Sequence, residues 1–109
     1  MAHSLVTIRK RSTFIMIRKK GKLSYGKTFN VQFLRTQGLN NSIYVGFTAT
    51  KKLGTAIKRN KAKRIMRELA RKVISKYGKI NSYYVLIAKS QIFDISFRSQ
   101  EIELKQLIS

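Results

Sequence analysis

The sequence predicts an α+β fold in which helices pack on a small sheet. Two segments alternate apolar and polar residues as strands do, a third is apolar on both faces, and two longer segments repeat apolar residues at helical spacing. With 109 residues and 43% hydrophobic content, the chain can fill one core. Because no linker, repeat or low-complexity tract divides it, we expect residues 1–109 to form a single domain.

The first predicted element is a short helix over Thr13–Lys20. Ser12 precedes it and is of the residue type that caps helix N-termini, whereas Gly21 is placed to end it. Three basic residues occupy its last turn, where the negative end of the helix dipole favours them. The sequence after this helix leaves room for a short strand near Ser24.

Two alternating strands follow, at Thr28–Arg35 and Ile43–Thr50. In the first, Phe29, Val31 and Phe33 share one face, which is typical of a strand with one buried side. Residues 37–42 between the strands are turn-like, so the pair is interpreted as a hairpin.

The second half of the chain begins with a long basic helix, for which Thr55 is the predicted N-cap and Gly78 the end. Tyr83–Ala88 then has apolar or aromatic residues on both faces, as a buried strand does. A last helix carries a stripe from Phe97 to Ile108. The strand, basic helix and strand form one crossover unit, for which the general rule favours a right-handed connection.

Charge points to the class of partner. The chain has 24 Lys and Arg against 4 acids, a net charge of +20 and an isoelectric point near 11.0. Eight basic residues lie between Arg9 and Lys27 and eleven between Lys51 and Lys76, so the charge is concentrated in two stretches. This balance is typical of proteins that bind a polyanion such as RNA.

The basic helix has an apolar arc and a cationic arc. On a helical wheel the second arc holds Arg59, Asn60, Lys63, Arg64, Arg67 and Arg71. Four of its cations follow one another at a spacing of four residues and repel by about 0.2 to 0.5 kcal/mol per pair. The first turns are basic too, although a helix N-terminus favours acids. Bound phosphates would relieve both conflicts, so this face is predicted to meet RNA.

The sequence argues against an active site on this chain. It has no cysteine, its acids Glu68, Asp94, Glu101 and Glu103 are dispersed, and its only histidine, His3, lies in a segment expected to fray. Protein-built metal or acid–base sites need clustered groups, so we expect no catalytic and no metal-binding residues here. No apolar run is long enough to span a bilayer and no signal peptide is apparent, which favours a soluble cytoplasmic protein.

One stretch of the chain resembles a known family. It consists of Val45-Gly46, Thr48, Lys51-Lys52-Leu53-Gly54 and the run from Arg59 to Glu68, which reads RNKAKRIMRE. The lysine pair and glycine ahead of an R-N-x-x-K-R-x-x-R-E helix are similar to the protein subunit of bacterial ribonuclease P. Weaker agreement at Phe14, Gly21 and residues 86–89 extends the resemblance over most of the chain.

The resemblance implies a four-stranded sheet with helices and a left-handed crossover, against the general rule. It also implies that a catalytic RNA subunit, using Mg²⁺ held mainly by that RNA, removes the 5′ leader of precursor tRNA. The protein would bind both the catalytic RNA and the leader, with no small-molecule substrate and no membrane. A structural RNA-binding protein of the ribosome remains the alternative, since it would share the charge and the length.

Two sets of site residues follow. The RNA-binding set consists of Lys51, Lys52, Arg59, Asn60, Lys61, Lys63, Arg64, Arg67 and Arg71. The leader-binding set consists of Phe14 as a stacking surface, with Lys10, Lys19 and Lys20 as backbone contacts. Phe14 has the alternative of being a core residue of the first helix.

This chain departs from the family at three positions. Lys61 stands where the family has arginine, and lysine lacks the planar fork that pairs with phosphate. Arg18 and Gln32 fall where the family usually has aromatics, so the leader cleft is expected to stack fewer bases and to depend more on charge. Phe29 and Phe33 could compensate, but their alternation with Val31 favours core positions.

Overall fold

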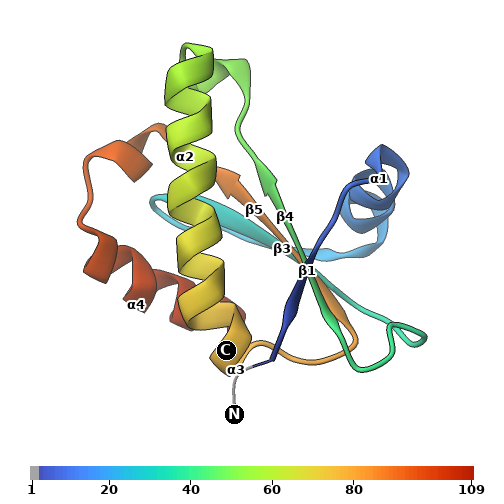
Figure 1. Cartoon of the computed structure of the whole chain (residues 1–109). Coiled ribbons are helices and arrows are strands. Elements are labelled where there is room, and N and C mark those ends of the chain that lie inside the picture. Colours follow the sequence, from blue (N-terminus) through green and yellow to red (C-terminus); the bar gives the residue numbers. More distant parts are fainter. Residues whose placement is uncertain (1–2) are drawn as a thin grey trace.

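The computed structural model describes residues 3–109, which form an α+β fold as predicted (Figure 1). In chain order the elements are β1 (Leu5–Thr7), α1 (Arg11–Lys20), β2 (Lys22–Ser24), β3 (Phe29–Arg35), β4 (Ile43–Thr48), the 3₁₀ turn η1 (Lys51–Leu53), α2 (Ala56–Leu69), the π-helical turn η2 (Ala70–Ile74), α3 (Ser75–Tyr77), β5 (Ser82–Ala88), the 3₁₀ turn η3 (Ser90–Phe93) and α4 (Phe97–Ile108). The sheet has five strands rather than four, because β1 lies in the segment that was expected to fray. The strand near Ser24 is present as β2.

The strand order is β1-β4-β5-β3-β2. β4 pairs with β1 and β5 in parallel, whereas β3 pairs with β5 and β2 in antiparallel fashion. The predicted hairpin of β3 and β4 is therefore wrong, because β5 lies between them. The physical reason is that β5 is apolar on both faces, with Tyr84 and Leu86 on one and Val85 on the other almost fully buried. Such a strand is most stable at the centre of a sheet.

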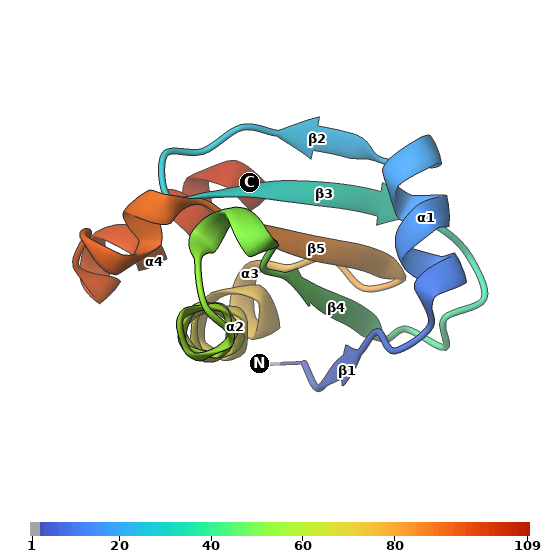
Figure 2. The same cartoon turned by 90° about the horizontal axis from the view of Figure 1, so that it is seen from above.

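The connection from β4 through α2 to β5 is left-handed. When the sheet is viewed from the side that α2 covers, with both strands pointing up, β5 lies to the left of β4 (Figures 1 and 2). The expectation from the resemblance therefore holds, and the right-handed connection that the general rule favours is wrong for this chain.

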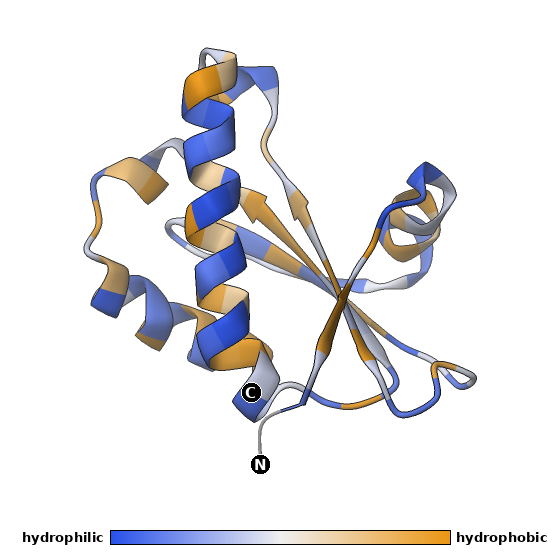
Figure 3. Ribbon diagram, in the orientation of Figure 1, coloured by the Kyte–Doolittle hydropathy of each residue, from blue (hydrophilic) through white to orange (hydrophobic). Residues whose placement is uncertain are grey.

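The two faces of the sheet are covered unequally. α2 and α4 lie on one side and α1 on the other (Figure 2). Under α2 and α4 is the main core, which includes Phe29, Val45, Met66 and Leu104. Hydrophobic and hydrophilic residues alternate along α2, which buries one face and exposes the other (Figure 3). The smaller cluster under α1 has three buried members, Ile8, Ile17 and Val85.

Three of the four predicted helix ends are confirmed. Gly78 follows Tyr77, the last residue of α3, which continues the basic helix beyond η2, and its amide donates to the Ile74 carbonyl at 2.8 Å. The Thr55 hydroxyl accepts a hydrogen bond from the Lys58 amide at 3.3 Å and caps α2. Gly21 ends α1, and a Cβ there would come within 2.7 Å of the Phe33 carbonyl oxygen, so glycine lets the helix end meet β3. The Ser12 cap is wrong, because α1 begins one residue before Ser12 and the cap position has no side-chain hydrogen bond.

Candidate nucleic-acid interface

The entry to α2 is a compact basic turn. Lys51 and Lys52 of η1 are exposed, whereas Leu53 is buried and anchors the turn to the core. Gly54 has φ of +121°, a conformation that side-chain-bearing residues rarely adopt. Its carbonyl oxygen accepts a hydrogen bond from Nη1 of Arg59 at 2.9 Å. Arg59 therefore fastens the loop to the helix, and part of its guanidinium is already engaged.

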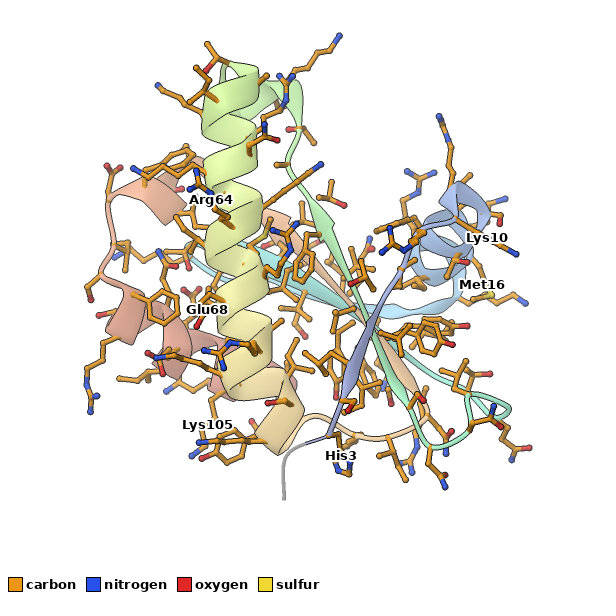
Figure 4. All side chains as sticks on the ribbon, in the orientation of Figure 1. His3, Lys10, Met16, Arg64, Glu68 and Lys105 are labelled. Atoms are coloured by element: carbon orange, nitrogen blue, oxygen red, sulfur yellow. The ribbon has the colours of Figure 1, made fainter. Side chains whose placement is uncertain are left out.

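The outer face of α2 carries most of the predicted RNA-binding set. Asn60, Arg64 and Arg67 are exposed, whereas Lys63 is half-buried. Figure 4 shows Arg64 and Glu68 on successive turns of this helix. The first turn of α2 contains no acid, so its free amide groups and the neighbouring lysines offer positive potential to an anion.

The last cation of the row has a protein partner that the sequence analysis missed. Nε of Arg71 donates to a Glu68 carboxylate oxygen at 3.2 Å, and Nη2 donates to the other. These hydrogen bonds from Arg71 lower the pKa of Glu68, which therefore stays ionised at neutral pH. Of the four cations expected to repel one another, Arg71 is thus neutralised, which is a correction to the predicted row.

Two flanks of α2 pack basic groups against aromatic rings. On the β4 side, the Arg67 guanidinium lies 5.8 Å from the centre of the Phe47 ring. On the α4 side, the Lys61 amine lies 5.9 Å from the centre of the Phe93 ring. Lys61 was assigned to the RNA-binding set, and the structure places its amine on the α4 flank of the helix, beside Phe93.

A cavity of about 220 Å³ lies between α1 and the sheet. Its lining consists of Arg11, Phe14, Ile15, Arg18, Gln32, Thr48 and Ile87. Phe14 is half-buried and also packs on the small core cluster. A Cβ at Gly46 would come within 2.5 Å of the Phe14 ring, so this glycine makes room for the ring on β4. Phe14 thus contacts the core and lines the cavity.

The charges that line this cavity differ from the predicted ones. Lys10, Lys19 and Lys20 are exposed but do not line it, whereas Arg11 and Arg18 do. Positions 11, 14, 15 and 18 share one helical stripe, and this spacing could have indicated the two arginines.

The structure also shows where the residues that depart from the family pattern lie relative to this cavity. Arg18 and Gln32 line the cavity, so Phe14 is its one aromatic residue, in line with the expectation of a more polar cleft. Phe29 is fully buried and Phe33 packs against the main core, which confirms that neither belongs to this cavity.

Residues 3–109 contain no group of three side chains able to hold a metal ion. Two of the four acids have structural contacts, since Glu68 pairs with Arg71 and Glu103 accepts hydrogen bonds from the backbone and hydroxyl of Thr28. The His3 backbone amide donates to the Ser75 carbonyl at 2.7 Å, which ties the start of the described chain to α2's C-terminal extension. None of the helices in this part of the chain has the length and apolar character needed to cross a bilayer.

Comparison with known proteins gives one consistent family. The sequence model of the family described as Ribonuclease P matches residues 3–109. A ribonuclease P protein component from Caulobacter vibrioides is 42% identical over 82 residues, which are 75% of this chain and 54% of that protein. The match thus spans about half the length of that relative.

Solved structures agree. The RNase P protein from Thermotoga maritima superposes with a TM-score of 0.80 and 28% identity, covering 94% of both chains. That from Staphylococcus aureus superposes with a TM-score of 0.77 and 27% identity, covering 93% of this chain and 90% of the other. The sequence match over nearly the whole chain, together with the shared fold, shows that this protein belongs to the Ribonuclease P protein family.

Proposed function

We propose that this chain is the protein subunit of ribonuclease P, which binds a catalytic RNA and the 5′ leader of precursor tRNA in the cytoplasm. The observation that carries the proposal is the pair of basic surfaces on opposite faces of one sheet. One is the α2 surface, defined as Lys51, Lys52, Asn60, Lys63, Arg64 and Arg67. The other is the α1 cleft, defined as the seven residues that line the 220 Å³ cavity.

The α2 surface suits folded RNA. Its arginines are exposed and can each form forked contacts with phosphate, while Asn60 can donate and accept hydrogen bonds at a base edge or a 2′-hydroxyl. α2 packs against the main core, so these contacts would be made by a firmly held helix. Such contacts would fix the position of the subunit on the RNA.

The α1 cleft suits a single strand. Phe14 offers an aromatic surface on which a base can stack, and Arg11 and Arg18 lie beside it to contact the sugar–phosphate backbone. A precursor tRNA has a leader to place there and a mature tRNA has none, so this cleft would give preference for the precursor. Lys10, Lys19 and Lys20 would add long-range attraction from the surface of α1.

Cleavage is assigned to the RNA. We propose that Mg²⁺ is bound mainly by RNA phosphates and that the protein holds those phosphates in place. This assignment rests on the general need of metal-assisted hydrolysis for clustered oxygen ligands, which RNA supplies at high density.

The test is reconstitution with a ribonuclease P RNA and labelled precursor tRNA. RNA and protein together should cleave at low Mg²⁺, where the RNA alone is slow, and the protein alone should not cleave at any Mg²⁺ concentration. Leader-dependent affinity is measured in parallel with precursor and mature tRNA. Equal affinity for both in the presence of the RNA would favour the ribosomal type of RNA-binding protein instead. Cleavage by RNA-free protein that disappears on mutation of one of its side chains would contradict the assignment to the RNA.

A further inference from the structure

Gln100 of α4 contains a buried polar atom with no partner. The residue is 1% exposed. Its Nε2 donates to the carbonyl oxygens of Ile92 at 2.8 Å and Ile95 at 3.0 Å. Since carbonyl oxygens accept only, these two contacts fix which end of the amide is nitrogen. Oε1 then has no hydrogen-bond donor among the described residues. A buried acceptor left in this state costs free energy, so it calls for an explanation.

Gln100 lines a cavity of about 140 Å³ on the α4 flank of α2. The other lining residues are Lys61, Ile65, Ile92, Phe93, Ile95 and Phe97. Apart from Gln100 and Lys61 these side chains are apolar, and two are aromatic. An apolar slot with one buried acceptor and one cation at its wall has the chemistry of a site for a flat heterocycle. Lys61 is exposed and its amine lies near Phe93, so it can meet a phosphate attached to that heterocycle.

The chemistry selects among the four bases of RNA. A base held here needs an N–H group for Gln100 Oε1 and few other polar atoms, because the remaining walls offer no hydrogen bonds. Guanine, cytosine and uracil would each bury at least one carbonyl group against isoleucine and phenylalanine. Adenine has an amino group and no carbonyl. Gln100 Oε1 is covered in the unbound chain, so a lining side chain has to shift for the amino group to reach it.

We propose that this cavity, the α4-side pocket, binds the base of an unpaired adenosine in an RNA strand that crosses α2. The proposal rests on the RNA-binding function proposed above and adds a base-recognition site to it. The α4-side pocket lies on the opposite face of the sheet from the α1 cleft, so the two are separate sites. Lys61, which is not part of the α2 surface, would be the phosphate contact of this adenosine.

The first experiment follows the Gln100 side chain directly. The full chain is labelled with ¹⁵N and titrated with AMP, UMP and ribose 5-phosphate. AMP should shift the side-chain amide resonances of Gln100, and ribose 5-phosphate should affect only basic regions. Ile95→Phe fills the pocket and should abolish the AMP-specific shift. Ile102→Phe makes the same change at an exposed position of α4 outside the lining and should retain it. Identical effects of AMP and ribose 5-phosphate on the unmodified chain would overturn the proposal.

The second experiment measures affinity for pentaadenylate and pentauridylate. Both are tested on the Phe14→Ala background, so that stacking in the α1 cleft is removed. Preference for pentaadenylate should persist there and should fall at least about fivefold on adding Ile95→Phe or Phe93→Leu, the range expected for loss of a stacked base. Phe93→Leu keeps an apolar side chain, so it serves if Ile95→Phe does not fold. A preference unaffected by both variants would overturn the α4-side pocket.

The source of the adenine and the underlying function are tested separately. AMP that binds as tightly as pentaadenylate would assign the pocket to a free nucleotide and overturn the RNA assignment. Affinity for ribonuclease P RNA is measured on the same samples. If that affinity is high while no adenine preference exists, only the pocket proposal fails. If the RNA does not bind at all, the proposed function fails.

Discussion

The α2 surface and the α1 cleft are both basic, but they rest on different supports. α2 lies on a core cluster of seventeen buried residues, whereas the cluster under α1 has three. The α2 surface is exposed and built from long cations, and the α1 cleft is a recess with one aromatic ring and two arginines. Under the proposed function, this difference predicts that the firmly supported α2 face would bind structured phosphates and that the less firmly supported α1 would contact the flexible leader strand. Each of the following predictions tests one part of this comparison.

The largest effect is expected from the core beneath α2. Met66→Ala removes a fully buried side chain and should lower the free energy of unfolding by about 2 to 5 kcal/mol, measured by urea denaturation. Ile17 is equally buried under α1, but its small cluster should let α1 open locally. Amide hydrogen exchange should therefore be faster in α1 than in α2. Equal protection of the α1 and α2 amides from exchange would contradict the claim that α1 is less firmly supported than α2.

The next effect concerns the α2 surface. Arg64→Ala should weaken binding to the catalytic RNA by about 1.5 to 3 kcal/mol, the value of a lost hydrogen bond between charged groups. The dependence of log K on log salt should also fall by about 0.7 to 0.9, corresponding to one phosphate contact. The ratio of precursor to mature tRNA affinity should not change. Arg98→Ala on α4, an exposed arginine outside the α2 surface, is the matched control and should have little effect.

Removing the aromatic ring from the α1 cleft should have the opposite effects on RNA binding and on precursor preference. Phe14→Ala should leave assembly with the RNA nearly intact and reduce the preference for precursor tRNA by about 1 to 3 kcal/mol, if one leader base stacks on the ring. Met16→Ala changes another half-buried residue of α1 that does not line the cavity, so it controls for lost packing. A large loss of stability in Phe14→Ala with unchanged precursor preference would make Phe14 a core residue only.

The smallest effect is expected at the Glu68–Arg71 pair. Glu68→Gln removes the charge that neutralises Arg71, so RNA binding should become slightly tighter at low salt. The slope of log K against log salt should become steeper by at most about 0.7 to 0.9, which corresponds to one additional phosphate contact. Asp94→Asn makes the same charge change at an exposed residue outside the α2 surface. If both substitutions change the RNA affinity equally, net charge alone explains the effect and Arg71 has no specific contact.

The parts of the fold that depend on local pattern were predicted from sequence. The alternation in β3 and β4, the apolar run of β5 and the Thr55 cap all depend on residues near one another in the chain. Strand pairing depends on distant residues, and here it was wrong. The two apolar faces of β5 were noticed, yet they were not used to place β5 between β3 and β4. With three residues, β1 is too short for any periodic pattern.

The positions of the candidate site residues were predicted in part, whereas their contacts with RNA stay a prediction. The α2 face could be read from helical spacing, and Phe14 from the resemblance. The pairing of Arg71 with Glu68 and the packing of Lys61 near Phe93 depend on side-chain directions and on the position of α4, which composition does not reveal. Arg11 and Arg18 were missed because charge was assigned to the most exposed lysines of α1, whereas the cleft takes its charge from the stripe next to Phe14.

The central position of β5 also determines when the sheet can assemble. β5 is the last of the five strands to be synthesised, and it is the strand that joins β1 and β4 to β3 and β2. Until Ala88 has left the ribosome, the nascent chain therefore consists of two separate strand pairs and an unsupported basic α2. Long-range pairing of this kind slows folding and prolongs the exposure of apolar surface. During that interval the chain already carries most of its positive charge, because only three of its 24 basic residues follow β5.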